Sequence, residues 1–478
     1  MSRYSVSPIA INDLVAVSGV SASIHGDSSV LVSGISQDSR DVQAGDLFCC
    51  VRGEKYDGHE YVTQAVENGA VALLVEVRNT AVPSHIVQLE VTHVRDVLGH
   101  VASALFGFPA HSLSLVGITG TNGKTTTAAI LQSILEASGK KAKVIGTLSG
   151  VHTTPEAIDT QALLREYLDD GVQAVVMEVS SHALAQDRVN GLVFDVAVFT
   201  NLGHDHLDFH GTQEMYFAAK AKLFDGSRAR HGVVNVDDSH GQRLHEAKPI
   251  PMTAFSRHDA TDIVVAIDQV AFMWRGTAIT VSLGGDFSVI NAIAAITAAE
   301  VLGISVEQMK SGCSNVKAVP GRFEIVPNNA GIDVIVDFAH TPDGLDGLLR
   351  SVRELSDGNI FLVFGCGGER DLAKRPRMGE IAARLADEVI VTSDNPRGEI
   401  PETIISSIIS GISEPATTVR AIVNRADAIE SAITDARRGD IVVIAGKGHE
   451  KTQEINGVLT PFSDVEVARV ALQNRKGD

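Results

Sequence analysis

The fold is decided by one stretch of the sequence, Gly117-Ile-Thr-Gly-Thr-Asn-Gly-Lys-Thr-Thr126. It follows an apolar run at 113–118 and precedes a helical pattern, so it predicts a glycine-rich turn between a strand and a helix. Glycines let the backbone approach a ligand closely, and the amides that begin a helix attract phosphate oxygens. We therefore predict a nucleotide-binding loop in which Lys124 reaches the β- and γ-phosphates and the Thr125 hydroxyl binds Mg²⁺.

The spacing of the glycines in this loop is irregular. A strict Walker A motif has a glycine five positions before Gly123, where this chain has Ile118, and its glycines fall at 117 and 120 instead. An ordinary glycine turn is the alternative, but strand, loop, Gly-Lys-Thr and helix occur together in register. A phosphate loop alone leaves ATPase, GTPase, kinase and ligase activities open.

Short β-branched runs alternate with helical patterns along the rest of the chain, which predicts an α/β fold with parallel sheets. Ligands bind beyond the carboxyl ends of such strands. Polar clusters in two separate sets directly follow the apolar runs at 174–177, 193–199, 332–336, 360–364, 389–391 and 441–444.

The length of 478 residues predicts two to four domains, and we place three. Residues 1–110 are expected to form a small α/β domain. Residues 111–318 are expected to form a P-loop ATPase-type parallel sheet, reached through a linker at Pro109–Ser112. Residues 319–478 are expected to form a C-terminal Rossmann-like sheet, opened by the turn Val319-Pro-Gly321.

The composition argues against several classes of function. Lys plus Arg total 40 against 59 for Asp plus Glu, giving a net charge of −19, and aromatics are 5%, so nucleic-acid binding is not expected. No apolar run approaches 18 residues and no secretion signal is evident, so we expect no membrane span and a cytoplasmic location. Four cysteines without zinc-site spacing, at 49, 50, 313 and 366, are expected to be reduced and mostly buried.

Candidate metal ligands follow the central strands. Glu178 ends one apolar run and can hold Mg²⁺, an ion that prefers oxygen ligands. His206 is a less usual ligand and is also readily explained as a locally bonded loop histidine, while His204 and His210 are better explained as structural or surface residues. Lys220 lies in an apolar helical stretch, and composition gives no reason to prefer it to Lys222.

Four segments in the right order resemble the Mur ligases, the amino-acid-adding enzymes of bacterial peptidoglycan synthesis. They are Thr119–Thr126, Glu178–His182, Thr200-Asn-Leu with Asp205-His206, and Pro320-Gly-Arg-Phe323. The resemblance covers nearly the whole chain. It implies an ATP-dependent ligase with three domains, of which 1–110 binds the uridine of a UDP-sugar and 319–478 binds the incoming amino acid.

Further segments narrow the resemblance within the family. Asp38-Ser-Arg40, Gly45–Phe48 and Asp57-Gly-His59 resemble the uridine-binding domain shared by members that add the third residue or the final dipeptide. Asp394-Asn-Pro-Arg397 resembles the members that add a diamino acid, and arginine at its fourth position accompanies meso-2,6-diaminopimelate. A guanidinium can hold the distal carboxylate of that molecule with two hydrogen bonds, and lysine has no such group.

The resemblance implies the following site residues. The ATP phosphates are implied to bind Gly120, Thr121, Asn122, Gly123, Lys124, Thr125 and Thr126. The adenine and ribose side corresponds to Asn291, Arg322, Asp337 and His340. The UDP-MurNAc-dipeptide corresponds to Gln37, Ser39, Thr153, Thr154, Ser180, Gln186 and Arg188. Diaminopimelate corresponds to Arg370, Asp394, Asn395, Pro396, Arg397, Gly446 and Glu450. Metal ligands correspond to Thr125, Glu178, His206 and a carbamylated Lys220. The family often has asparagine where this chain has Ser288, which weakens the expectation of adenine contacts there.

The implied reaction joins UDP-MurNAc-L-Ala-D-Glu to a diamino acid through an acyl phosphate, with Mg²⁺ as cofactor. Lys124, Glu178, His206 and carbamylated Lys220 are the implied catalytic groups. Because the two predicted sites lie on different domains, we expect the C-terminal domain to close on substrate binding. We expect a monomer.

Three alternatives remain open at this point. The same ligase could add lysine or ornithine. A folylpolyglutamate synthetase-like ligase would share the phosphate loop, but residues 34–60 argue against it. A non-catalytic nucleotide-binding regulator would be expected to lack Lys124, Glu178 or His206, and all three are present.

Overall fold

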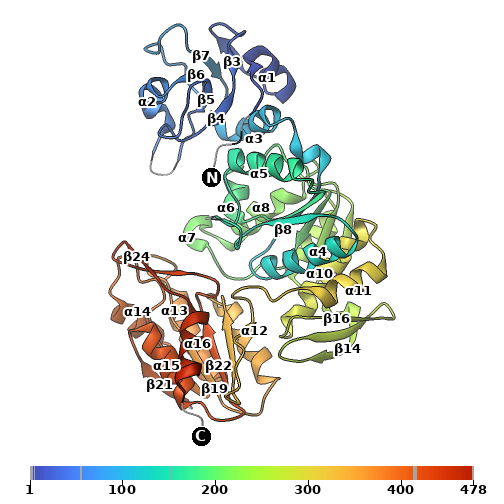
Figure 1. Ribbon diagram of the computed structural model, residues 1–478, viewed down its shortest axis with the longest axis vertical. Helices are drawn as coiled ribbons and strands as arrows, with labels where there is room; N and C mark the ends of the chain where they lie inside the picture. Colours follow the sequence, from blue (N-terminus) through green and yellow to red (C-terminus); the bar gives the residue numbers. More distant parts are fainter. Residues whose placement is uncertain (1–3, 5, 54–55, 151, 413–416, 476–478) are drawn as a thin grey trace.

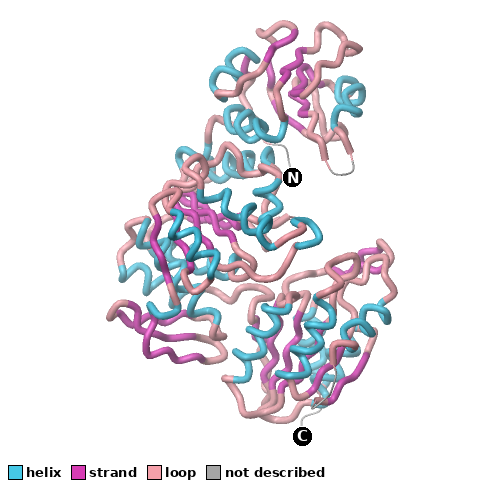
Figure 2. The backbone as a smooth tube through the Cα atoms, turned by 180° about the vertical axis from the view of Figure 1, so that it is seen from behind, coloured by secondary structure: helices cyan, strands magenta, loops and turns pink. Residues whose placement is uncertain are grey.

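A computed structural model describes residues 4, 6–53, 56–150, 152–412 and 417–475. The chain forms three successive parts, each built around its own sheet (Figure 1). Seen from behind, helices flank the strands of each of the two larger sheets (Figure 2). The α/β class with mostly parallel sheets, expected from the alternating apolar runs, is confirmed.

The N-terminal part contains a five-stranded sheet in which only the β2–β7 pair is antiparallel. In sheet order its strands are β2 (Ser23–His25), β7 (Val87–Glu90), β6 (Ala70–Val75), β5 (Asp46–Cys49) and β4 (Gly34–Ser36). A small ribbon pairs β1 (Ile9–Ala10) with β3 (Leu31–Val32). The helices are α1 (Ile11–Ser18), α2 (Val62–Glu67) and α3 (Val94–Leu105).

The central part has a six-stranded, fully parallel sheet. Its order is β13 (Met252–Phe255), β12 (Gly232–Asn235), β11 (Val196–Phe199), β8 (Ser114–Thr119), β10 (Ala174–Glu178) and β9 (Ala142–Ile145). One face is covered by α4 (Lys124–Ala137), α10 (Phe287–Val301) and α11 (Val306–Asn315). The other face is covered by α5 (Ala157–Asp169), α6 (Ser181–Ala185), α8 (Gln213–Ala221) and α9 (Ser239–Ala247).

Both faces of this sheet are buried because its strands are apolar on both sides. Val116 and Ile118 pack against α4, whereas Leu115 faces the opposite core. This is the continuous apolar pattern expected of strands covered by helices on both faces. An antiparallel extension consists of β14 (Ala260–Val265), β15 (Val270–Trp274) and β16 (Thr277–Val281).

The C-terminal part has a second six-stranded sheet, parallel except for its first edge strand. Its order is β17 (Glu324–Ile325), β18 (Asp333–Asp337), β22 (Ile441–Ala445), β19 (Ile360–Phe364), β20 (Glu388–Val391) and β21 (Thr418–Ala421). One face packs on α12 (Pro342–Arg353), α13 (Lys374–Leu385) and α14 (Pro401–Ile409). The other packs on α15 (Arg425–Asp435) and α16 (Asp464–Asn474). A hairpin, β23 (Thr452–Ile455) with β24 (Val458–Pro461), stands beyond the sheet.

Helix α3 joins the N-terminal part closely to the central part. Gly99 lies so near the chain at Asn190 that a Cβ on it would come within 1.8 Å of the Asn190 carbonyl oxygen. Ala157 and Ile158 of α5 belong to the same apolar core as Leu98. The predicted domain boundaries at 110 and 318 stay predictions, although a turn at Pro109–Ser112 does precede β8.

All four cysteines are buried and unpaired. Burial raises the pKa of Cys50, Cys313 and Cys366 to about 12, so these thiols stay protonated at neutral pH. Among the residues that the structure describes, no helix is long and apolar enough to cross a membrane.

Candidate active site

The phosphate loop leaves β8 at Thr119 and enters α4 at Lys124, as the sequence predicts. Gly120 has φ +150°, and a Cβ there would lie 1.9 Å from the Thr200 hydroxyl oxygen. Gly123 has φ +86°, and a Cβ there would lie 2.3 Å from Asn291 Oδ1. Ile118, at the strict Walker position, is fully buried strand core. The irregular spacing therefore follows from packing around the loop.

Two lysines meet at one backbone oxygen beneath this loop. Lys124 Nζ donates to the Gly120 carbonyl oxygen at 2.9 Å, and Lys220 Nζ donates to the same oxygen at 3.0 Å. Lys220 is 1% exposed and lies over the Tyr216 ring, whereas Lys222 is much more exposed and bonds Leu184 O. Burial, and then the Lys124 charge, hold the pKa of Lys220 well below its usual range.

Glu178 ends β10, the strand beside β8, and its carboxylate is buried. It accepts hydrogen bonds from the Thr125 hydroxyl at 2.9 Å and from the Thr147 amide and hydroxyl at 2.9 and 3.1 Å. A carboxylate beside a hydroxyl at a phosphate loop suits Mg²⁺, which takes few protein oxygens and keeps waters or phosphate oxygens. Within the described part of the chain, no three His, Cys, Asp or Glu side chains are grouped so that they could hold a metal ion.

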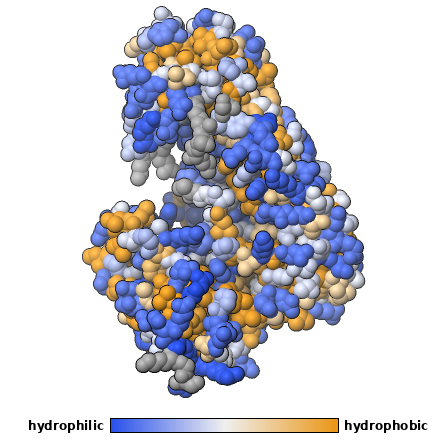
Figure 3. Space-filling model, viewed as in Figure 1, coloured by the Kyte–Doolittle hydropathy of each residue, from blue (hydrophilic) through white to orange (hydrophobic). Residues whose placement is uncertain are grey.

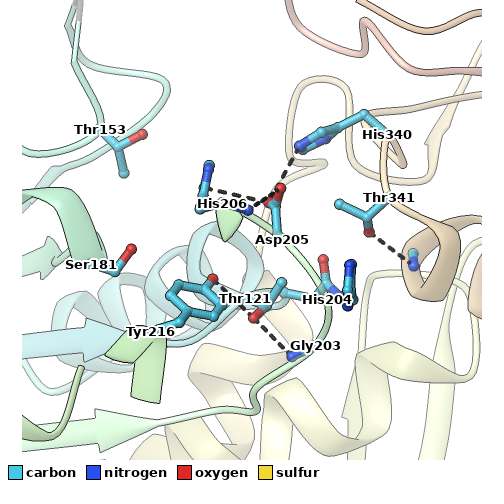
Figure 4. A network of polar contacts seen from close by, with 12 residues as sticks. Thr121, Thr153, Ser181, Gly203, His204, Asp205, His206, Tyr216, His340 and Thr341 are labelled. Carbon is cyan, nitrogen blue, oxygen red and sulfur yellow. Dashed lines mark hydrogen bonds and ion pairs between the residues drawn. The ribbon is translucent and has the colours of Figure 1, made fainter. Parts of the chain in front are cut away.

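Asp205 lies between His206 and His340 at the junction of the central and C-terminal parts (Figure 4). His206 Nε2 lies 3.4 Å from Asp205 Oδ2, and His340 Nε2 lies 3.9 Å from the same oxygen. Burial lowers the pKa of His206, so its imidazole is neutral at pH 7. His210 is buried and bonded to Ser181 Oγ at 2.9 Å, which fits the structural role expected for it. His204 is partly exposed, with its ring 4.0 Å from an Asp371 oxygen.

Arg322 lies at the start of the C-terminal part, and its side chain contacts the phosphate loop. Its Nη2 donates to Thr125 Oγ1 at 3.3 Å, and its guanidinium stacks over the Phe338 ring at 4.5 Å. Its Nε is buried and has no hydrogen-bond partner in the described structure, which leaves a donor for a bound ligand. Asp337 instead holds the backbone, because it accepts from the amides of Phe323 and Ala339 at 2.7 Å each.

Residues of both larger parts line one cleft of about 840 Å³, which we call the shared cleft. The surface is deeply hollowed where the N-terminal and C-terminal parts stand apart beside the central part (Figure 3). The predicted site residues that line it are Thr121, Asn122, Gly123, Lys124, Thr125, Thr126, Thr153, Glu178, His206, Asn291, Arg322, Asp337, His340, Arg370, Asn395 and Glu450. Ser288 is buried and bonds Gly284 O within its own helix end.

Of the Asp394–Arg397 loop, Asn395 lines this cleft, whereas Asp394, Pro396 and Arg397 lie outside its lining. Asn395 Nδ2 donates to Glu450 Oε2 at 2.8 Å. Arg397 has φ +51°, donates through Nη1 to Gly368 O at 2.7 Å, and lies 3.5 Å from Glu454. The remaining members of the predicted pocket lie around this loop. Asp394 is buried, a Cβ on Gly446 would lie 2.6 Å from its Oδ2, and a Cβ on Gly368 would lie 2.0 Å from Pro396 O.

Sequence reasoning did not single out Lys447, which is 0% exposed and bonds both Asn395 and Glu450. The available signal was its place in Gly446-Lys-Gly-His-Glu450, directly after the apolar run that forms β22. Composition could not show that the side chain turns inward.

The residues expected to hold the nucleotide-sugar peptide fall into two groups. Thr154 bonds Glu178 O at 2.8 Å and lies 3.3 Å from Ser180 Oγ, and Arg188 Nη1 donates to Thr154 O at 3.0 Å. Gln186 accepts from Arg188, and Thr153 contacts Thr147. Two others, Gln37 and Ser39, lie in the N-terminal part, outside the lining of the shared cleft.

Ser39 Oγ donates to Gln64 Oε1 at 2.7 Å, and Gln37 Oε1 is buried with no hydrogen-bond partner among the described residues. A ligand that touches both groups must therefore extend from the N-terminal part to the central sheet.

Comparisons with known proteins agree with this arrangement. Residues 31–105, 118–299 and 321–448 match the models of the Mur ligase family catalytic domain, the Mur ligase middle domain and the Mur ligase glutamate ligase domain. The chain is 42% identical to the UDP-N-acetylmuramoyl-L-alanyl-D-glutamate–2,6-diaminopimelate ligase of Syntrophomonas wolfei, over 93% of this chain and 95% of that one. It is 40% identical to the ligase of the same name from Geobacillus kaustophilus, over 94% and 96%.

Solved structures of similar fold include other Mur ligases. A structure of a UDP-N-acetylmuramoyl-L-alanyl-D-glutamate–2,6-diaminopimelate ligase superposes with a TM-score of 0.69 and 31% identity, covering 98% of this chain and 99% of that one. MurF from Acinetobacter baumannii, at 21% identity and a TM-score of 0.68 over 92% and 96%, shares the fold. The three domain models and the relatives that span more than nine tenths of the sequence show that this chain belongs to the Mur ligase family.

Proposed function

We propose that this chain is an ATP-dependent ligase that joins meso-2,6-diaminopimelate to UDP-N-acetylmuramoyl-L-alanyl-D-glutamate, as the names of its relatives state for them. One observation supports this most strongly. The phosphate loop and the Asn395–Glu450 pocket, which come from two different sheets, line the same cleft. A nucleotide on one side and an amino acid on the other can therefore react without leaving it.

The first step uses the phosphate-loop side. The γ-carboxylate of the D-glutamyl residue attacks the γ-phosphate of ATP and forms an acyl phosphate, releasing ADP. In this step Lys124 Nζ is proposed to give up its hydrogen bonds to the Gly120 and Thr121 carbonyl oxygens and to bind phosphate oxygens instead. Arg322 Nε, which has no hydrogen-bond partner among the described residues, is proposed to donate to the nucleotide. Thr125, Glu178 and His206 would hold Mg²⁺, which would supply positive charge to offset the negative charge on the transferred group. Such electrostatic groups typically contribute about 3–4 kcal/mol each to lowering the barrier.

The second step uses the C-terminal side. The amine of the diamino acid attacks the acyl carbon, and the tetrahedral intermediate expels inorganic phosphate while the nitrogen loses a proton. The amino acid would be held where Glu450 and Asn395 line the shared cleft, and Arg370 lines the same cleft. Arg397 is proposed to bind the distal carboxylate, in place of its contacts with Gly368 O and Glu454.

Lys220 is proposed to be carbamylated. A neutral amine adds to CO₂ to give a carbamate and a proton, and burial beside Lys124 favours the neutral amine. If both lysines were charged, the two ammonium groups on the Gly120 carbonyl oxygen would repel each other. A carbamate on Lys220 carries a negative charge, so it would attract the Lys124 ammonium instead. The new carboxylate would then be a further oxygen ligand for Mg²⁺.

The N-terminal part is proposed to bind the uridine end, through the region of Gln37 and Ser39. The unpartnered Gln37 Oε1 supports this, because a buried acceptor without a donor suits a ligand N–H. The monomeric state and cytoplasmic location stay predictions.

A phosphate-release assay with ATP, Mg²⁺ and UDP-MurNAc-L-Ala-D-Glu tests the proposal. We expect turnover with meso-diaminopimelate and little with lysine or ornithine. If lysine supports turnover and diaminopimelate does not, the assignment of the amino acid is wrong. If phosphate is released with glutamate and a reduced folate in place of the UDP substrate, the peptidoglycan assignment itself is wrong.

A further inference from the structure

Lys447 is a fully buried cation at the end of the cleft where the diamino acid is proposed to bind. It follows β22, while Asn395 follows β20, and β19 lies between these two strands. The lysine side chain spans this gap: Nζ donates to Asn395 Oδ1 at 3.0 Å and to Glu450 Oε2 at 2.7 Å. One ammonium therefore connects two residues that line the cleft.

These bonds fix the orientation of both partners. Asn395 Oδ1 accepts from Lys447 and from the Glu454 amide at 3.0 Å, so its Nδ2 must face Glu450, to which it donates at 2.8 Å. Both bonds to Glu450 end on Oε2, so neither uses Oε1. Burial by itself would raise the pKa of Glu450, but Lys447 and Asn395 outweigh it and hold this pKa below its usual value. The carboxylate is thus kept ionised and in place.

Stability alone gives a poor account of this lysine. An ammonium loses its hydration when fully buried, and replacing a whole buried ion pair by apolar side chains is often neutral or stabilising. Another buried cation, Arg425, already joins the two segments that carry Asn395 and Lys447. Arg425 donates to Ser393 O at 3.4 Å and to Ala445 O at 2.9 Å, just before Asn395 and Lys447 in the chain, and pairs with buried Asp464.

We propose that Lys447 is a positioning residue for the diamino acid: it holds Asn395 and Glu450 so that Glu450 Oε1 can accept an ammonium group of that substrate. This rests on the proposed function of the pocket, and it adds a residue that touches no substrate. The lysine acts through its two partners, so its loss should weaken binding of the diamino acid and leave the nucleotide side unchanged.

The test replaces Lys447 by methionine (K447M), which keeps length and apolar packing and removes the ammonium. We expect KM for meso-diaminopimelate to rise roughly 10- to 100-fold, the range for losing charge-assisted hydrogen bonds. The KM values for ATP and the UDP substrate should stay within about two-fold of the unmodified protein, since Lys447 does not contact that side. K447Q, which can still donate one hydrogen bond to either partner, should fall between K447M and the unmodified protein.

A double variant separates positioning from general damage. If Lys447 acts through Glu450, then K447M added to E450Q should raise KM little beyond E450Q alone. K374M is the matched control, because Lys374 is also buried in this part but donates to His340 O on the nucleotide side. It should not change KM for the diamino acid selectively.

Several results would overturn the proposal. One is a KM for diaminopimelate that does not change in folded K447M, and another is a KM that rises equally for all three substrates. A third is an effect of K447M on KM that adds fully to that of E450Q. The last is failure of both K447M and K447Q to fold. ADP binding by calorimetry reports folding of the variants. If the unmodified protein uses lysine instead of diaminopimelate, the assigned substrate is wrong, and the same KM comparison with lysine still decides the role of Lys447.

Discussion

The meeting of Lys124 and Lys220 at the Gly120 carbonyl is the most unusual feature at the scale of single residues. A buried pair of like charges is unfavourable, and the attraction of Asp205 for a charged Lys220 does not outweigh burial and the Lys124 charge, which lower the pKa of Lys220. A chemical change that makes one of the two anionic would remove the conflict. Lys220 is therefore the residue whose replacement tells most about the site.

We predict that Lys220→Ala lowers kcat by roughly 100- to 1,000-fold, because an electrostatic group beside the transferring phosphoryl would be lost. Short carboxylic acids added to the assay should restore part of the activity by occupying the space of the carbamate. Lys222→Ala is the control, since Lys222 is half-exposed, and it should retain ordinary activity. Wild-type activity in Lys220→Ala would remove the carbamate from the mechanism.

A second prediction concerns Arg397. Arg397→Met should raise KM for diaminopimelate by roughly 10- to 150-fold, the value of a charge-assisted hydrogen bond of about 1.5–3 kcal/mol. The preference over lysine should shrink in parallel, because the lost interaction involves a carboxylate that lysine lacks. Arg397→Lys, which keeps the charge but not the planar fork, should fall between the two. The measurement is the ratio of kcat/KM for the two amino acids, and a ratio unchanged in Arg397→Met would exclude this role.

Single residues also show how far the sequence can be interpreted. Lys124, Thr125 and Glu178 are recognisable because a motif or a strand end identifies them, and all three line the shared cleft. Lys220 and Lys222 cannot be separated by composition, since only the fold shows which one is buried. Lys447 was missed for the same reason, because a lysine in a glycine-rich turn is ordinarily solvated. Its side chain is buried through hydrogen bonds to Glu450 and to Asn395, and Asn395 is distant in the chain.

At the scale of elements, Arg425 at the start of α15 ties the ends of β20 and β22 together. It pairs with Asp464 at the start of α16, and both side chains are fully buried. Loss of one partner leaves an uncompensated buried charge, which costs far more than loss of an exposed pair. These two helix starts therefore hold the strand ends on which the amino-acid pocket is built.

We predict that Arg425→Met lowers the free energy of unfolding by about 3–5 kcal/mol, because it leaves Asp464 buried and unpaired. Arg469→Met is the matched control on α16, where the pair with Glu466 is exposed, and it should change this free energy by less than about 1 kcal/mol. Urea unfolding followed by circular dichroism measures both. Equal effects of the two substitutions would contradict the assigned role of the buried pair.

Helix α3 provides the corresponding test for the N-terminal part. A methyl group on Gly99 would collide with the Asn190 carbonyl oxygen, so Gly99→Ala should lower the melting temperature even though alanine favours helices. The cost should be about 1–3 kcal/mol, as for overpacking in a core. Gly347→Ala in α12 is the control, since a methyl group there meets no atom within 4 Å. A Gly99→Ala protein as stable as the control would show that α3 and the central part can move apart freely.

At the scale of the whole molecule, polar contacts around the shared cleft join the two larger parts. Asp343 at the start of α12 accepts from the His204 amide at 3.1 Å, and Arg322 reaches Thr125. The acyl phosphate must be protected from water while the amine arrives, which favours a cleft that closes over its contents. The N-terminal part, held by α3, is not expected to take part in this motion.

We predict that small-angle scattering shows a smaller radius of gyration when a non-hydrolysable ATP analogue and the UDP substrate are bound together. We expect either ligand alone to give a smaller change. A radius of gyration that is the same with and without both ligands would count against domain closure.

The sequence predicts the order of the three sheets well and their mutual placement poorly. Apolar runs and the polar clusters after them are local patterns, so strands such as β8, β10 and β22 could be anticipated. The contact between Gly99 and Asn190, and that between Asp343 and His204, join segments whose meeting no local pattern encodes. The antiparallel β14–β16 extension was likewise not anticipated.

The four buried thiols have a practical consequence for following such motions. Maleimides react with thiolates, and buried thiols with raised pKa values offer almost none in the folded protein. Cysteines introduced at Val77 in the N-terminal part and Val458 in the β23–β24 hairpin, both well exposed, should therefore take fluorescent dyes against a silent background. Energy transfer between the two dyes could then report opening and closing one molecule at a time, without first replacing a native cysteine.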